Sequence, residues 1–150
     1  MDEGAGMAHH QMRGCGILFF DVQKQRVLLF RRDNKPSIRF PGCIDILGGH
    51  IDEGESPEKA IAREMAEELD DLRNGLSFKL EKYHKFKVYT DEGGTEHHIF
   101  WKEADFDILD VHLKEGQELV WLTEEKIPST PFAFGFDAVI REFFQANKNK

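Results

Sequence analysis

The sequence predicts an α/β protein with a mixed central sheet that helices cover on both faces. Two continuously apolar runs, residues 17–20 and 27–30, are typical of strands buried on both sides. A helical pattern begins near Ser56, and a second one occupies residues 135–145. Strands interleaved with helices favour a layered α/β architecture.

The first strands follow a polar N-terminal stretch. Residues 1–12 are polar and unpatterned, so we expect a disordered tail before a single domain at residues 13–150. Strands are predicted at residues 16–22 and 26–32, with a short polar turn between them. A loop with two prolines follows, and a short strand at residues 44–47 leads to Gly48 and Gly49.

The first helix has clear start signals and no early stop signal. Ser56 is a good N-cap and Pro57 suits the first helical position. An apolar stripe runs along Ile61, Met65, Leu69 and Leu72, so we predict a helix that continues past residue 70 to residue 72 or 73. The alternative is that the residue at position 70 adopts a positive φ and the helix stops at Leu69.

The second half of the chain contains a hairpin and a final helix. Its strands are predicted at residues 78–90 and 96–106, around the turn at residues 91–94. A loop is expected at residues 111–116, a strand at 119–122 and a helical turn at 123–127. Apolar residues at 136, 139, 140 and 143 lie on one face of the last helix.

Composition narrows the possible partners. The 150 residues carry a net charge of −8, which disfavours long nucleic acid or an anionic membrane as a partner. No apolar run approaches the length of about 20 residues that a membrane span requires. Two cysteines, Cys15 and Cys43, suggest a reducing compartment without a disulfide framework, so we expect a cytoplasmic protein.

Three carboxylates of the first helix point to a metal. Glu64, Glu67 and Glu68 stand at helical spacing i, i+3 and i+4, so they share one face. Carboxylates packed in this way repel one another unless a cation lies among them. Oxygen ligands of this kind suit Mg²⁺, and Mn²⁺ may substitute. A purely solvated acidic face is the alternative for this helix alone.

The loop before the helix completes a longer pattern. Glu55 follows Gly49 after five residues, and Arg63 and Glu64 come after seven more, before the Glu67–Glu68 pair. This stretch resembles the Nudix box, and the chain resembles the MutT-like branch of the Nudix hydrolases. The resemblance implies a Nudix α/β/α sandwich over nearly the whole chain. The sequence departs from the box at residues 70 and 71, where aspartates replace a glycine and an aliphatic residue.

The resemblance also implies roles for individual residues. Glu67 and Glu68 are expected to be catalytic, together with a further carboxylate from outside the box, which we assign to Glu115 with Glu118 as second choice. The expected metal ligands are the carbonyl group of Gly48 and the carboxylates of Glu64, Glu67, Glu68 and Glu115. Gly49, Glu55 and Arg63 are expected to be structural, with Glu55 and Arg63 pairing the loop with the helix.

Substrate contacts are less clear from the sequence. Arg31 and Arg32 end a strand, and one of them is expected to reach a phosphate, although a surface role is equally open. Phe134 is expected to stack on a base, with Phe132 as an equal candidate and core packing as the alternative for both. His97 and His98 point to opposite faces of their strand, where core or surface roles are expected, although one could approach a phosphate.

The resemblance implies a small nucleotide as the substrate. The expected reaction is Mg²⁺-dependent hydrolysis of a nucleoside diphosphate linked to another group. A (deoxy)nucleoside triphosphate giving a monophosphate and pyrophosphate is the first expectation. A nucleoside diphosphate sugar or a dinucleotide is the alternative, and a non-catalytic nucleotide-binding module is a third. A monomer and a homodimer are both compatible with the sequence.

Overall fold

The computed structural model describes residues 11–148, so most of the expected N-terminal tail lies outside the described residues. Met12 is tied to the domain, because its carbonyl oxygen accepts a hydrogen bond from the amide of Glu96 at 2.9 Å. In chain order, the elements are β1 (Arg13–Asp21), β2 (Arg26–Arg31), β3 (Ile44–Asp45), β4 (Leu47–His50), α2 (Pro57–Glu68), β5 (Leu69–Asp71), β6 (Leu76–Ser77), β7 (His84–Thr90), β8 (Glu96–Glu103), the 3₁₀ turn η1 (Ile108–Asp110), β9 (Val111–Leu113), β10 (Glu118–Thr123), the 3₁₀ turn η2 (Glu124–Ser129) and α3 (Phe136–Ala146).

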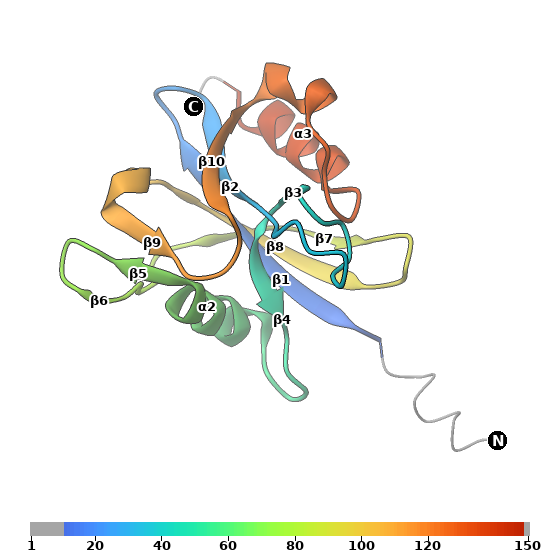
Figure 1. Cartoon of the computed structure of the whole chain (residues 1–150), viewed down its shortest axis with the longest axis horizontal. Coiled ribbons are helices and arrows are strands. Elements are labelled where there is room, and N and C mark those ends of the chain that lie inside the picture. Colours follow the sequence, from blue (N-terminus) through green and yellow to red (C-terminus); the bar gives the residue numbers. More distant parts are fainter. Residues whose placement is uncertain (1–10, 149–150) are drawn as a thin grey trace.

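The central sheet is mixed, as the sequence predicts. Its strand order is β10-β2-β1-β8-β7, with β3 paired to β2 and β4 paired to β1. The β1–β8 pair is parallel and the other pairs are antiparallel. Helices α2 and α3 lie on opposite sides of this sheet, which gives the α/β/α arrangement (Figure 1).

The alternation of side chains along β1 builds two cores. Ile17 and Phe19 point to the side of α2, where they pack with Ile61 and Met65. Leu18 and Phe20 point to the side of α3. A strand in the middle of a sheet buries both faces, which is why its sequence is continuously apolar.

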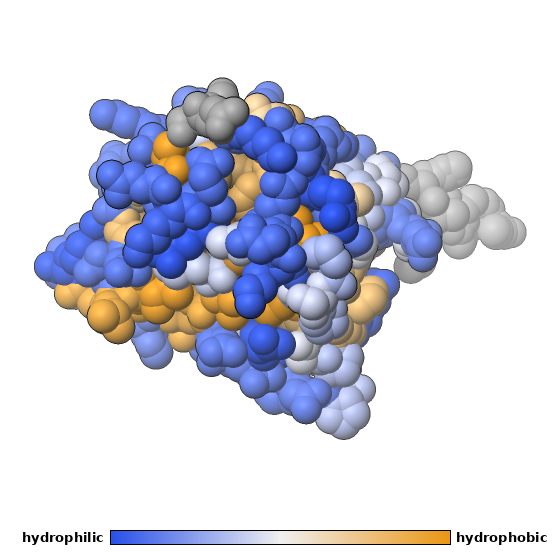
Figure 2. Space-filling model, turned by 90° about the horizontal axis from the view of Figure 1, so that it is seen from above, coloured by the Kyte–Doolittle hydropathy of each residue, from blue (hydrophilic) through white to orange (hydrophobic). Residues whose placement is uncertain are grey.

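No helix in residues 11–148 is long and apolar enough to cross a membrane. The face shown in Figure 2 is mostly hydrophilic, with an apolar strip.

The prediction for the end of the first helix is wrong. Helix α2 ends at Glu68, and Leu69–Asp71 form the extended strand β5. The alternative is also wrong, because no positive φ occurs at Asp70. Leu72, expected to be buried on the helix stripe, is 57% exposed. The carboxylate of Asp71 accepts hydrogen bonds from the guanidinium of Arg73.

Strand pairing explains this early stop. β5 pairs antiparallel with β6 and with β9, which occupies part of the expected loop at residues 111–116. The carbonyl of Glu68 accepts from the amide of Lys114 at 2.9 Å, and that of Leu69 accepts from the amide of Phe78. In a longer helix, Asp70 and Asp71 would also have lain at the negative C-terminal end of the helix dipole, where carboxylates are unfavourable. Long-range hydrogen bonds therefore outweigh the local helical pattern.

The remaining elements follow the prediction with shifted boundaries. The hairpin strand β7 begins at residue 84 rather than 78, because Phe78 and Leu80 are buried in the core beneath the sheet instead. Strand β1 changes neighbours along its length: its C-terminal part pairs with β2 and its N-terminal part pairs with β4. Residues of β1, β2 and β4 line a cavity at this place.

Candidate active site

A cavity of about 880 Å³ connects the acidic side of α2 with the segment that precedes α3. One end is lined by four carboxylate side chains: Glu64, Glu67, Glu68 and Glu115. The other end is lined by arginine and aromatic side chains together with two polar groups: Arg32, Arg39, Asp45, His97, Phe134 and Phe136. The cavity is therefore negatively charged at one end, and aromatic with cationic groups at the other.

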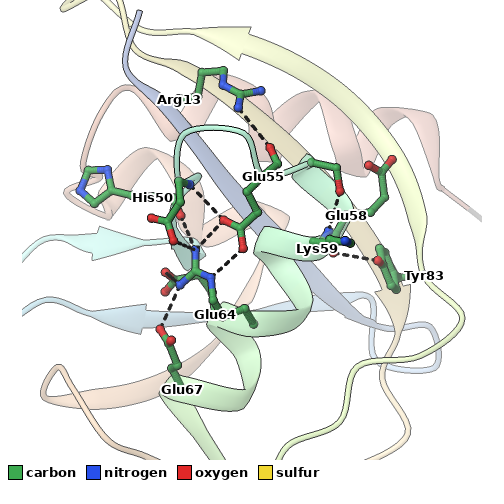
Figure 3. A network of polar contacts seen from close by, with 11 residues as sticks. Arg13, His50, Glu55, Glu58, Lys59, Glu64, Glu67 and Tyr83 are labelled. Atoms are coloured by element: carbon green, nitrogen blue, oxygen red, sulfur yellow. Dashed lines mark hydrogen bonds and ion pairs between the residues drawn. The ribbon is translucent and has the colours of Figure 1, made fainter. Parts of the chain in front are cut away.

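Arg63 organises the acidic end. Its Nε and Nη2 atoms donate to the two carboxylate oxygens of Glu55 at 2.8 and 2.9 Å, and Nη2 also donates to the carbonyl oxygen of His50 at 2.9 Å. Its Nη1 atom donates to Glu64 at 2.9 Å and to Glu67 at 3.1 Å. Figure 3 shows Glu55, Glu64 and Glu67 in this network, which joins the glycine loop to the helix.

Glu55 is the anchor of this loop. The hydrogen bonds from Arg63, followed by that from the amide of Asp52, lower its pKa from 4.5 to about 2. Helix α2 begins just after it, where Ser56 Oγ accepts the amide of Lys59 at 3.1 Å and Pro57 fills the first helical position. The expected N-cap and the expected contact between Glu55 and Arg63 are both present, and they place the first turn of α2 against β4.

Both glycines of β4 are required by close approach. A Cβ atom on Gly48 would lie 1.9 Å from the carbonyl oxygen of Cys15, and one on Gly49 would lie 2.2 Å from Cδ of Glu64. Any side chain at these positions would displace β1 or the Glu64 carboxylate. Glycine here lets the backbone of β4 pass directly beside the acidic face of α2.

The end of α2 brings the fourth carboxylate into place. Because the amide of Lys114 binds the carbonyl of Glu68, the next residue, Glu115, lies close to the Glu68 side chain. Burial, followed by repulsion from Glu115, Glu64 and Glu67, raises the pKa of Glu68 to about 7. Burial also raises the pKa of Glu64, although Arg63 opposes this. The acidic end of the cavity therefore carries more negative charge than the single positive charge of Arg63 can neutralise.

The opposite end of the cavity is built around Phe134. The guanidinium groups of Arg32 and Arg39 lie 5.4 and 5.1 Å from its ring centroid, and the ring of Phe40 packs edge-on at 4.8 Å. Arg32 is held by the buried carboxylate of Asp45 at 2.7 Å. Burial raises the pKa of Asp45, and the hydrogen bond from Arg32 opposes this shift. The arginine and the aromatic rings therefore form one packed wall.

Comparisons with known proteins decide the family. Residues 10–143 match the NUDIX domain family. The chain belongs to the Nudix hydrolase family. It is a hydrolase of the class that acts on pyrophosphate bonds. Over 96 residues it is 30% identical to nucleoside triphosphatase NudI of Enterobacter sp. (strain 638), which covers 59% of this chain and 67% of NudI.

Solved Nudix structures share the fold. A MutT structure from a study of the Aliivibrio salmonicida and Vibrio cholerae enzymes has a TM-score of 0.70 at 18% identity, over 92% of this chain and all of that one. The NUDIX domain of Shewanella oneidensis NrtR, solved with ADP ribose, has a TM-score of 0.66 at 20% identity, over 97% and 98% of the two chains. At these identities the similarity concerns the fold.

The Nudix carboxylates fit a divalent cation by charge and by donor type. Four carboxylates crowd one end of the cavity, and hard oxygen donors suit Mg²⁺. One carboxylate oxygen of Glu64 and one of Glu67 accept a hydrogen bond from Arg63, and the second oxygen of each does not. Among residues 11–148, no group of three such side chains already converges on one point. A cation would relieve the repulsion that raises the pKa of Glu68.

The structure brings most of the predicted site residues together, with some exceptions. Arg31 does not line the cavity; its guanidinium binds Glu118 at 3.1 Å, so neither reaches the acidic end. Both phenylalanine candidates are partly buried against the core on the side of α3, and of the two only Phe134 is among the residues that line the cavity. Arg32 lines the cavity, as does Glu115.

Sequence reasoning missed part of the wall. Asp45 and Arg39 line the cavity although the sequence did not mark them as candidates; His97, named as one of two histidines that could approach a phosphate, also lies in the wall. Asp45 stands two residues before Leu47 on a short strand, and a charged residue inside an otherwise apolar run was the available signal. No local pattern marks Arg39, because its position depends on the fold of the loop at residues 33–43.

Proposed function

We propose that this Nudix hydrolase cleaves nucleoside triphosphates into a nucleoside monophosphate and pyrophosphate, with Mg²⁺ as cofactor. The observation that carries the proposal is the two-ended cavity, with four carboxylates at one end and an aromatic and arginine wall at the other. The triphosphatase name of NudI supports the same substrate class.

The carboxylates are proposed to hold the cofactor. Glu64, Glu67, Glu68 and Glu115, with the carbonyl group of Gly48, would be the ligands. When bound, Mg²⁺ would neutralise phosphate charge and lower the pKa of attacking water. Glu67 and Glu68 are proposed as the catalytic pair, assisted by Glu115. Mn²⁺ has the same preference for oxygen ligands and is expected to substitute.

Each remaining part of the site has a proposed task. Arg63 and Glu55 hold the loop on the helix, so that the carboxylate of Glu64 stays beside Gly49. Arg32 would bind a phosphate or the base, since it is fixed by Asp45 and lines the cavity. Phe134 would stack on the base, because its ring also lines this wall.

A panel of substrates tests which pyrophosphate bond the protein cleaves. Purified protein is incubated with Mg²⁺ and with nucleoside triphosphates, deoxynucleoside triphosphates, nucleoside diphosphate sugars and ADP ribose, and the products are separated by anion exchange. We expect monophosphate and pyrophosphate from a triphosphate. Release of orthophosphate alone, or a preference for a sugar nucleotide, would overturn the proposed substrate.

The location is proposed from the thiols. Cys15 and Cys43 are both free, and burial raises the pKa of Cys15 to about 12. Free thiols are usual in reducing compartments, which supports a cytoplasmic protein.

A further inference from the structure

A buried histidine–aspartate pair lies beside the cavity, and its histidine, His97, lines the cavity together with Phe134 and Phe136. His97 Nε2 lies 2.9 Å from Asp91 Oδ2, and the two residues are 9% and 8% exposed. Asp91 Oδ1 also accepts the amide of Thr95 at 3.1 Å. Neither the Arg63 network nor the proposed metal ligands use this pair.

The pair sets the tautomer of His97. Burial alone would raise the pKa of Asp91, but the hydrogen bonds from His97 and Thr95 lower it, so the group is a carboxylate. A carboxylate only accepts hydrogen bonds, so Nε2 of His97 must carry the hydrogen. In the neutral ring, Nδ1 then has a lone pair and is an acceptor.

Gly14 leaves this acceptor uncovered. A Cβ atom at Gly14 would lie 3.1 Å from Nδ1, and both residues line the cavity. Among residues 11–148, Nε2 of His97 has a hydrogen-bond partner in Asp91, whereas Nδ1 has no partner. Nδ1 is not among the fully buried polar atoms of the described residues, and His97 lines the cavity, so a ligand in the cavity can donate a hydrogen bond to it.

Aromatic rings hold His97 on several sides. Phe136 packs edge-on at 4.9 Å, Tyr89 stacks at 6.0 Å, and Phe134 lies 5.8 Å away. The ring therefore cannot turn freely, and Nδ1 has a defined direction. A planar ligand stacked on Phe134 would present its edge within reach of His97.

We propose that Nδ1 of His97 accepts a hydrogen bond from an exocyclic amino group of the nucleobase, and that Asp91 is the positioning residue that holds His97 in the accepting tautomer. The inference deepens the proposed function, since it rests on a nucleotide as substrate. A hydroxyl group of the ribose offers the same donor chemistry, but a sugar does not stack on aromatic rings as a base does. The neighbouring Phe134 and Phe136 therefore favour the base.

The experiment compares nucleotides that differ by one amino group. ATP, GTP and CTP are each measured against the analogue that lacks the exocyclic amino group, and against the 2′-deoxy form. We expect kcat/KM to favour the amino-bearing member of at least one pair by about tenfold, the size of one hydrogen bond in a desolvated site. His97→Phe keeps an aromatic ring and should bring that ratio close to one.

The second variant tests the tautomer. In Asp91→Asn, the side-chain amide can donate to Nε2, which places the hydrogen on Nδ1 and turns it into a donor. The preference for the amino group should then be lost or reversed, whereas a purely structural role for Asp91 would lower stability without changing the ratio. His98→Phe is the matched control, because His98 binds Glu96 on the other face of the strand.

The affinity of the same nucleotides is then measured by calorimetry for the Glu68→Gln protein and for its double variants with His97→Phe and with Asp91→Asn. Discrimination by binding without any triphosphate hydrolysis by the wild-type protein would reject the proposed function and keep this inference. A wild-type ratio near one in every pair would overturn the inference, as would a ratio that survives both variants. Discrimination that follows only the 2′-hydroxyl would assign Nδ1 to the ribose and also overturn it.

Discussion

The two ends of the cavity differ in how they are built. The acidic end comes mainly from one continuous stretch, residues 48–68, in which Arg63 binds three acidic side chains of the same loop and helix. The aromatic end gathers side chains from segments that are far apart in the chain, including Arg32, Asp45, His97 and Phe134. Within a family, the continuous stretch can carry shared chemistry while the assembled wall varies with the substrate.

Glu115 lies at the acidic end of the cavity but comes from a segment far from residues 48–68 in the chain. It lies outside the box, but the pairing of β5 with β9 brings it beside the last helical carboxylate. The backbone bond from Lys114 to Glu68 forms only because the helix ends at Glu68. The early end of α2, which the sequence pattern did not predict, is thus what completes the acidic end.

The largest effect is expected at the acidic end. Glu68→Gln should lower kcat by at least about 10²-fold, because it removes a carboxylate from the proposed metal site. The thermal midpoint should change little, since Glu68 makes no side-chain ion pair in the described part of the chain. Steady-state kinetics with saturating Mg²⁺ and thermal melts check both. Glu53→Gln, an exposed change in the same loop, is the control, and near-normal turnover of Glu68→Gln would refute the role.

A smaller effect is expected for the carboxylate from outside the box. Glu115→Gln should reduce turnover by roughly 10- to 100-fold with an unchanged melting temperature, as is usual when one supporting group of a metal site is lost. Glu118→Gln should be silent, because it removes only a surface pair with Arg31. If Glu118→Gln impairs turnover and Glu115→Gln does not, the assignment is wrong by three residues.

The aromatic end should respond through binding rather than turnover. Phe134→Leu should raise KM by roughly fivefold or more and leave kcat within about twofold, because stacking on a base contributes about 1–3 kcal/mol. Phe132→Leu is the comparison, since Phe132 packs against the same core but does not line the cavity. A fall in kcat with KM unchanged would show that the two ends are not separable in this way.

The smallest effect concerns the loop anchor and depends on pH. The pKa of Glu55 is about 2 in the folded protein, against 4.5 ordinarily. As the pH falls, the unfolded chain therefore takes up this proton first, and the stabilisation is complete above pH 4.5 and lost towards pH 2. Wild type should melt above Glu55→Gln at pH 7, and the difference should shrink as the pH is lowered from 5 to 3.5. A difference that is constant over this range would contradict the assignment.

Local patterns were sufficient for the acidic helix and its loop. Ser56, Pro57 and the spacing from Gly49 to Glu68 predict a capped helix that presents its carboxylates on one side, and the structure contains it. These features depend on neighbours within a few residues, which the order of amino acids specifies directly. The mixed sheet also agrees with the prediction.

Contacts between distant segments account for the rest. Leu69 and Leu72 continue the helical period, but hydrogen bonds from residues 78 and 114 to the end of α2 outweigh that local preference. Arg31 and Arg32 are equivalent in sequence, yet the register of β2 with β10 directs Arg31 to Glu118, while Asp45 holds Arg32 at the cavity. His97 lies in the wall beside Gly14 of the neighbouring strand, where a Cβ atom would come within 3.1 Å of its Nδ1. Such outcomes depend on which strands become neighbours, and no local window of the sequence contains that information.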